Sequence, residues 1–193
     1  TMWTKFYGSA FYESSQGVIV EDDGSFLFVN TLGILTRING EGDVLNAFSY
    51  GNDQSFSLEK TSQSAYLLGA NGADVTKLDS DLLPLWSNSY LSGLNARITD
   101  FHETGNGDYL VSGVIIDASN NAFVLRIDEN GNLLWMKQYD SGGSDVATGI
   151  VELPNGNLMV SGYTSGYGFS QTGGLLLLLN STGDVINTKT VNG

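Results

Sequence analysis

Short apolar stretches alternate with clusters of glycine, asparagine, aspartate and serine along the whole chain. In residues 96–103, Ile98 and Phe101 stand among polar residues with a period close to two, which is typical of a β-strand with one buried face. Residues 104–107 (Thr-Gly-Asn-Gly) suit a tight hairpin turn, and residues 108–116 are mostly apolar and β-branched, as in a strand covered on both faces. No stretch follows the 3.6-residue period of an amphipathic helix.

This succession of four strands occurs four times. Its outermost strand begins at Trp3, Asn46, Trp86, Trp135 and Asn187, so the repeat is about 46 residues long. Repeats of roughly 40–50 residues with four short strands are typical of propeller blades. We therefore predict an all-β fold, a β-propeller built of four repeats with four antiparallel strands each, plus one extra N-terminal outer strand.

We expect one domain over residues 1–193, with repeats at approximately 8–50, 51–90, 91–139 and 140–193, and with residues 1–7 as the extra outer strand. The second repeat is irregular, because Ser62, Gln63 and Ser64 replace the usual glycine turn. Sixteen strands fill four blades, so the extra strand at residues 3–7 needs a partner. We favour a compact four-bladed ring; the alternatives are a segment of a larger propeller or edge-to-edge pairing in an oligomer.

Composition excludes several kinds of partner and chemistry. The chain has 21 acidic and 8 basic residues and a net charge of −13, which repels nucleic acid and anionic membrane surfaces. It has no cysteine, hence no disulfide and no thiolate metal site. The longest apolar run, residues 175–179, is too short to span a bilayer, and the first residues lack the pattern of a secretion signal, which was removed or never present.

Three motifs carry a resemblance to a known group of proteins. They are Trp-x-Lys-x-Tyr at residues 3–7 and 135–139, Asn-Gly-Asn-Leu-x-Val-Ser-Gly at 155–162, and Ile-Asp-x-Asn-Gly-Asn-x-x-Trp at 127–135. The chain resembles the β-propeller repeats of secreted bacterial surface proteins, and is similar to the seven-bladed β-propeller repeat and quinoprotein-like propeller groups. The resemblance implies a scaffold or binding module located extracellularly or at the cell surface, and it transfers no catalytic residue and no cofactor.

Acidic and basic residues recur near the strand ends of the repeats. The acids are Glu21, Glu59, Glu103 and Glu152, and the bases are Arg37, Lys77 and Arg126, with Leu178 at the fourth position. The acids form either a cation or sugar site or, as we favour, a structural contact made in every blade. That contact either caps the turn between the first and second strands or is a pair with a base, which we expect in a neighbouring blade. In that case Glu152 lacks a partner and is the acid most available for another role.

No metal site is predicted. Residues 21–24 and 128–132 contain the Asp, Asn and Gly of calcium loops, but their spacing is wrong and hairpins favour the same residues. His102 is the single histidine, which leaves no histidine cluster for a metal or for acid–base catalysis.

The loop at residues 164–173 is the longest connection between the second and third strands of a repeat, and insertions on one face of a repeat protein often form the binding surface. Its aromatic side chains either stack on a sugar ring or peptide, or fold over a neighbouring blade. The candidate ligand-binding residues are Tyr163, Tyr167, Phe169, Gln171 and Glu152.

We therefore expect a non-catalytic binding or scaffold module of a secreted or cell-surface bacterial protein, with a protein or glycan ligand, no cofactor and no membrane insertion. A homo-oligomer formed through exposed edge strands stays open. The alternative function is a glycan-active enzyme that uses inner-strand carboxylates such as Asp100 and Glu152.

Overall fold

The computed structural model of the chain describes residues 4–7, 15–50, 55–168 and 172–191. Within these ranges it contains sixteen β-strands in four sheets, each of four antiparallel strands in chain order, which confirms the predicted all-β repeat architecture. We call the sheets blades 1 to 4. The described residues include no helix that is long and apolar enough to cross a membrane.

Each blade runs from an inner strand, which contacts the inner strand of the next blade, to an outer one. Blade 1 contains β1 (Ser15–Val20), β2 (Phe26–Asn30), β3 (Ile34–Ile38) and β4 (Val44–Ser49). Blade 2 contains β5 (Ser55–Lys60), β6 (Tyr66–Ala70), β7 (Asp74–Leu78) and β8 (Pro84–Ser89). Blade 3 contains β9 (Ala96–Glu103), β10 (Tyr109–Ile115), β11 (Asn121–Ile127) and β12 (Leu133–Tyr139). Blade 4 contains β13 (Asp145–Glu152), β14 (Leu158–Thr164), β15 (Gly173–Leu179) and β16 (Val185–Val191).

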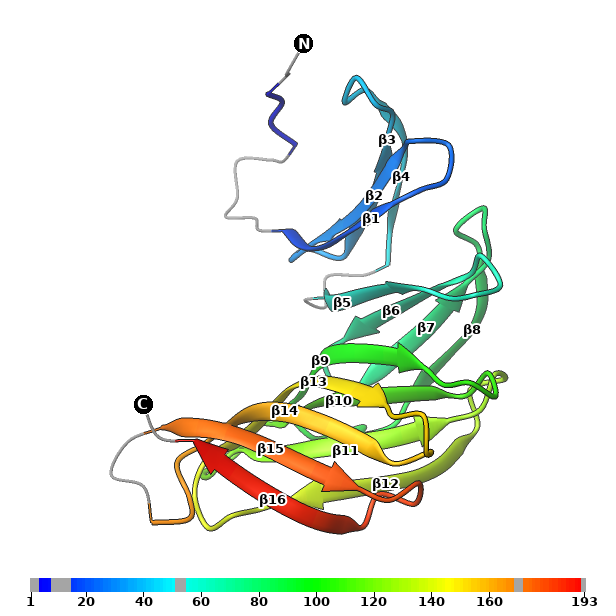
Figure 1. Cartoon of the computed structure of the whole chain (residues 1–193). Helices are drawn as coiled ribbons and strands as arrows, with labels where there is room; N and C mark the ends of the chain where they lie inside the picture. The colour runs from blue at the N-terminus through cyan, green and yellow to red at the C-terminus, as the bar shows by residue number, and fades with distance from the viewer. Residues whose placement is uncertain (1–3, 8–14, 51–54, 169–171, 192–193) are drawn as a thin grey trace.

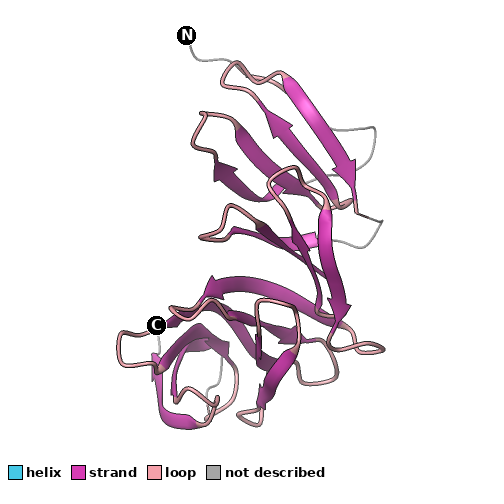
Figure 2. Ribbon diagram, turned by 90° about the vertical axis from the view of Figure 1, so that its right-hand side faces the viewer, coloured by secondary structure: helices cyan, strands magenta, loops and turns pink. Residues whose placement is uncertain are grey.

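The four blades form an open arc. Figures 1 and 2 show blade 1 at one end and blade 4 at the other, with blades 2 and 3 between them. Among the described residues, extensive contacts join only strands of the same blade or of consecutive blades. The favoured prediction of a closed four-bladed ring is therefore wrong, because the turn from each blade to the next is too small for four blades to complete a circle.

The core lies between consecutive blades. All residues of β10 are buried, since alternate side chains point to opposite faces and both faces are covered. Tyr109 and Val111 pack against blade 2, while Leu110 packs with Leu158 and Val160 of blade 4. Outer strands such as β12 are mostly exposed.

Every inner strand carries a β-bulge opposite the second strand of its blade. In blades 3 and 4 the residue facing the bulge is a glycine, Gly113 or Gly162. A Cβ atom at Gly113 would lie 2.1 Å from the carbonyl oxygen of Arg97, and one at Gly162 would lie 2.0 Å from that of Val146. These glycines are therefore required by close approach of the backbone.

The hairpin between the third and fourth strands is closed by a side-chain oxygen in all four blades. In blade 3, Oδ1 of Asp128 accepts the backbone N–H groups of Asn130 (2.9 Å) and Asn132 (2.8 Å). The hydrogen bond from the side chain of Asn132 lowers the pKa of Asp128. Asn39, Asp79 and Asn180 accept the equivalent pairs of N–H groups. The polar residues of this loop thus form a turn, as the hairpin interpretation predicts.

A tyrosine at or just after the end of the outer strand binds the following blade in blades 1, 2 and 3. The hydroxyl groups of Tyr50, Tyr90 and Tyr139 donate to carbonyl oxygens of Leu82, Gly131 and Gly183, each in the last hairpin of the following blade. Trp86 and Trp135 pack against the core and against the glycines of these hairpins, Gly131 and Gly183. Trp3 lies outside the described residues.

The described part of the predicted extra strand, Thr4–Tyr7, forms no β-ladder. It nevertheless makes the contacts of an outer strand with blade 1. The Tyr7 hydroxyl donates to the carbonyl oxygen of Gly42 (2.5 Å), and Lys5 pairs with Asp43, as Tyr139 and Lys137 do with Gly183 and Asp184.

Replacing Gly113 with Ala should lower the free energy of unfolding by about 3 kcal/mol, because the new methyl group overlaps a backbone carbonyl. The control is Gly40→Ala, where the nearest atom to the added Cβ is 3.9 Å away. Urea unfolding followed by tryptophan fluorescence measures both. Equal midpoints for the two variants would contradict the close approach.

Candidate functional site

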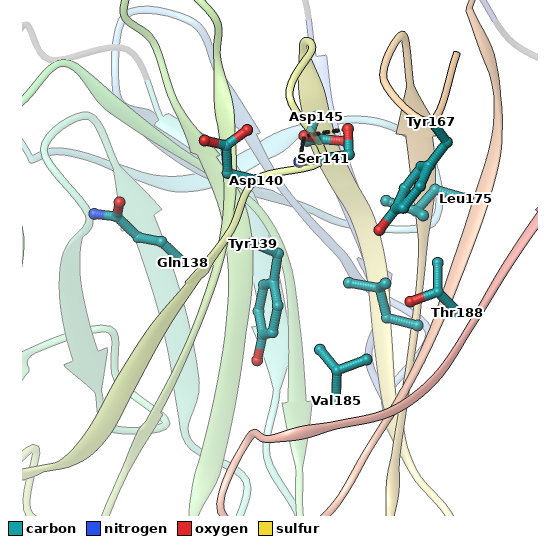
Figure 3. A pocket seen from close by; sticks show the side chains of 10 residues that line it. Gln138, Tyr139, Asp140, Ser141, Asp145, Tyr167, Leu175, Val185 and Thr188 are labelled. Atoms are coloured by element: carbon teal, nitrogen blue, oxygen red, sulfur yellow. Dashed lines mark hydrogen bonds between the residues drawn. The ribbon is translucent and has the colours of Figure 1, made fainter. Parts of the chain in front are cut away.

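A cavity of about 230 Å³ opens between the outer strand of blade 3 and blade 4 (Figure 3). β12 and the segment after it form one side, and β15, β16 and the loop after β14 form the other. It is lined by Gln138, Tyr139, Asp140, Ser141, Asp145, Tyr167, Leu175, Leu177, Val185 and Thr188.

A buried carboxylate fixes one wall of this cavity. Asp145 is 1% exposed, and its Oδ2 accepts the backbone N–H of Ser141 at 2.7 Å. The Ser141 Oγ lies 2.8 Å from both carboxylate oxygens of Asp145 and 2.8 Å from the Thr164 hydroxyl. Burial of a carboxylate is tolerated because its oxygens are hydrogen-bonded. The network joins the segment between blades 3 and 4 to the end of β14.

Close contact between glycines brings together the segment between β12 and β13 and the loop after β14. A Cβ at Gly143 would lie 2.5 Å from the backbone nitrogen of Gly166, and a Cβ at Gly166 would lie 1.8 Å from the Ser141 Oγ. The backbone of Ser144 and the backbone and hydroxyl of Ser165 also exchange hydrogen bonds. The loop that leads to Tyr167 is thus anchored at its base.

Two tyrosines face the cavity from opposite sides (Figure 3). Tyr167 has a positive φ of 54° and is 53% exposed, so its ring is accessible to a ligand. Tyr139 donates its hydroxyl to the carbonyl oxygen of Gly183, and burial raises its pKa well above the usual value, with a smaller contribution from Asp184. Tyr139 is therefore a neutral, fixed part of the wall, and Tyr167 is the accessible aromatic group.

Of the five predicted ligand-binding residues, Tyr167 alone lines this cavity in the described part of the chain. Tyr163 is 41% exposed on the face of β14 that points away from blade 3. Glu152 lies at the far end of β13, where it accepts the backbone N–H of Gly105 at 2.9 Å. Phe169 and Gln171 lie outside the described residues. The assignment of these residues to a ligand stays a prediction.

Sequence reasoning did not identify Gln138, Asp140, Asp145 and Thr188 as site residues. Gln138 lies near the end of the outer strand of blade 3 and Asp140 directly follows that strand, whereas Thr188 belongs to blade 4. Only blade packing brings them together. The available signal was the sequence Asp-Ser-Gly-Gly-Ser-Asp at residues 140–145, a glycine-rich segment with an acid at each end.

The recurrent glutamates do not occupy one position of the repeat. Ladder register aligns Glu103 with Glu152, whereas Lys60 and Val20 stand at that position in blades 2 and 1. This position contacts the first turn of the preceding blade: Glu103 accepts from the N–H of Ser62 (2.6 Å), and Glu152 accepts from that of Gly105. In blade 2, Lys60 donates to Glu21 at 3.0 Å.

Pairing of the recurrent bases with acids of neighbouring blades, which we expected, is wrong for the two arginines. Arg126 pairs with Asp108 (2.8 Å) and Arg37 approaches Glu21 (3.7 Å), each within its own blade. Both acids lie in or beside the turn that precedes the second strand, which brings them next to the third strand. Lys77 lies 5.3 Å from the ring centre of Tyr109 in the next blade.

The two carboxylates of the enzyme alternative both bind backbone groups. Asp100 accepts the N–H of Ile150 at 2.9 Å, and Glu152 accepts that of Gly105. Each thus serves the contact between blades 3 and 4. Within the described residues, no group of three or more Asp, Glu or His side chains is placed to hold a metal ion.

No model of a known protein family matches the chain, and no curated protein matches it either. Solved structures do match. A protein of unknown function from Bacteroides caccae aligns with a TM-score of 0.61 and 18% identity over 92% of this chain and 67% of its own. The WD40 β-propeller domain of Doa1 aligns with a TM-score of 0.62 and 17% identity over 77% of this chain and 47% of its own.

The Dos1 propeller aligns with a TM-score of 0.66 and 11% identity over 93% of this chain and 47% of its own. At these identities the likeness establishes the fold alone, which is a β-propeller arrangement of blades. The chain spans about half the length of the Doa1 and Dos1 structures and 67% of the length of the Bacteroides protein.

Replacing Asp145 with Ala should lower the free energy of unfolding by about 2 kcal/mol, because the part-buried N–H and hydroxyl of Ser141 lose their acceptor. Glu41→Ala, at an exposed position, is the matched control and should change little. Chemical unfolding measures both. A loss for Asp145→Ala no larger than that of the control would contradict the network.

The chain should lose stability as pH rises above the ordinary carboxyl pKa values. Burial raises the pKa of both Glu59 and Asp100, and Asp100 and Glu103 add to the shift at Glu59. The folded chain therefore holds protons that the unfolded chain releases above its usual values of 4.5 and 3.8. Glu59→Gln should flatten this part of the pH dependence in urea titrations. An unchanged pH profile would argue against a protonated Glu59.

Proposed function

We propose that this β-propeller is a non-catalytic binding module that takes a sugar residue of a glycan into the cavity between blades 3 and 4. The observation that carries the proposal is the half-exposed ring of Tyr167 beside a polar wall of fixed geometry. An exposed aromatic ring offers a flat apolar surface, while the carboxylate, amide and hydroxyl groups around it offer hydrogen bonds.

The size and charge of the cavity support a small, uncharged or cationic group. Its volume of about 230 Å³ is below the roughly 300–1,000 Å³ of sites that enclose drug-sized ligands. One sugar ring at the end of a longer chain suits such a site. Asp140 at the rim and the net charge of −13 disfavour anionic ligands.

The setting we propose is a secreted or cell-surface protein of a bacterium. Support comes from the repeat motifs at residues 127–135, 135–139 and 155–162, which resemble those of secreted bacterial surface propellers. The likeness to a Bacteroides caccae protein adds a bacterial structure of the same fold. A glycan-active enzyme gains no support, because Asp100 and Glu152 are engaged by backbone N–H groups.

A glycan array followed by calorimetry with the best binder tests this function. Tyr167→Ala should weaken binding about tenfold or more, since the accessible ring is lost. Tyr163→Ala is the matched control, because Tyr163 is similarly exposed but does not line the cavity. Binding that survives Tyr167→Ala, or that depends on Tyr163 alone, would refute the cavity as the site. Binding to peptides and to no glycan would assign the module to protein contacts.

A further inference from the structure

The two ends of the arc expose faces that are buried everywhere else in it. The leading face of blade 1 comprises Val18, Val20, Phe26, Phe28 and Ile38, and it forms an apolar groove with Tyr7. Val18 is 66% exposed, whereas Leu58, the equivalent residue of blade 2, is 8% exposed and packs against blade 1.

The trailing face of blade 4 is the matching half of the same kind of interface. It comprises Val151, Met159, Tyr163, Leu176 and Leu178, which share one side of the sheet by their register. Val151, Tyr163 and Leu176 are exposed, while the opposite side of the sheet is buried against blade 3. The leading face of blade 1 therefore lacks a trailing face to pack against, and the trailing face of blade 4 lacks a leading face.

One contact is polar at all three interfaces between consecutive blades of the arc, and both end faces lack its polar residues. At the end of the inner strand, Lys60, Glu103 and Glu152 each bind the first turn of the preceding blade. Their partners at one position of that turn are Asp22, Ser62 and Gly105. Blade 1 has Val20 in place of the charged residue, and blade 4 has Pro154, which has no N–H, in place of the partner. At this position neither Val20 nor the missing N–H of Pro154 requires a hydrogen-bond partner from the opposite face.

A second polar contact is replaced in the same way. The Arg37 guanidinium donates to the Tyr66 hydroxyl of the next blade at 3.3 Å, and Lys77 lies over the ring of Tyr109. At these positions the trailing face of blade 4 has Leu178 and the leading face of blade 1 has Phe26. Both partners have changed from polar to apolar, so the faces complement each other.

We propose that the occupant of these faces is a second copy of this chain, with blade 4 of each copy docked on blade 1 of the other to close a ring of eight blades. Two identical contacts related by a two-fold axis satisfy both ends of both arcs. With 93% of its length the chain covers 47% of the Dos1 propeller structure, so two copies supply about the chain length of that propeller. Lys189 of β16 then faces Asp43 as Lys137 faces Asp184 within one chain.

Residues 4–7 compete with the second copy. Tyr7 and Lys5 occupy the place on blade 1 that β16 needs, through the bonds to Gly42 and Asp43 and a ring contact with Phe28 at 5.5 Å. β16 has Val191 where the tyrosine stands in the other outer strands. The segment is held by fewer bonds than the fully paired β16, so it is the one displaced.

Sedimentation equilibrium on the full chain tests the proposal. The wild type should form a dimer that does not grow further, and Tyr7→Ala should tighten it about tenfold, because the competing segment loses its hydrogen bond. Val20→Glu should weaken association about tenfold or more, since its carboxylate meets Pro154 without a donor. Val20 is exposed in the single chain, so this variant keeps its fold, which circular dichroism checks.

A rescue variant gives the sharpest result. Adding Pro154→Ser to Val20→Glu supplies the N–H and hydroxyl that Ser62 gives Glu103, and should restore the dimer. Wild type and Tyr7→Ala that both stay monomeric up to about 1 mM would overturn the proposal and leave the two faces to further blades of a longer polypeptide. Association that ignores Val20→Glu, or that continues into long polymers, would overturn it as well.

Discussion

The structure depends on the burial of apolar sheet faces between consecutive blades. Among the described residues, blades 2 and 3 are covered by another sheet on both faces, and blades 1 and 4 on one. Burial of apolar area contributes about 25 cal/mol per Å², so the blade-to-blade contacts are the main source of stability in a chain without cysteine. The effect is clearest in β10, which is buried at every residue because blades lie on both sides. The polar contacts around the core, such as Tyr139 with Gly183, set the register in which these faces meet.

The candidate site arises where the repeat varies. Contacts repeated between the blades serve packing, as the engaged carboxylates of Glu103 and Glu152 illustrate. The cavity instead depends on features found once among the described residues: the buried Asp145, the glycine contact between two loops and the exposed ring of Tyr167. A constant scaffold thus fixes the positions of variable groups, which is how loops on a repeat protein acquire specificity.

Much of the fold could be predicted from the sequence, because the strands follow from local alternation and turn residues. Even the irregular second repeat was predicted as four strands, and Ser64 takes the left-handed φ of 58° that glycine takes in the other blades. The opening of the arc could not be predicted, since it depends on the small rotation that packed side chains impose between sheets. For the same reason the sequence indicated Tyr167, an aromatic residue in the longest loop, but not Gln138 or Asp140, which approach it only across a blade boundary.

The sequential contact pattern also bears on how the chain folds. Among the described residues, extensive contacts reach no further than the next blade. Each blade that leaves the ribosome can therefore pack at once against the blade synthesised before it. A growing chain then has one unfinished apolar face at its advancing end and needs no distant segment before its core can form. Synthesis from the N-terminus and the direction of assembly along the arc coincide.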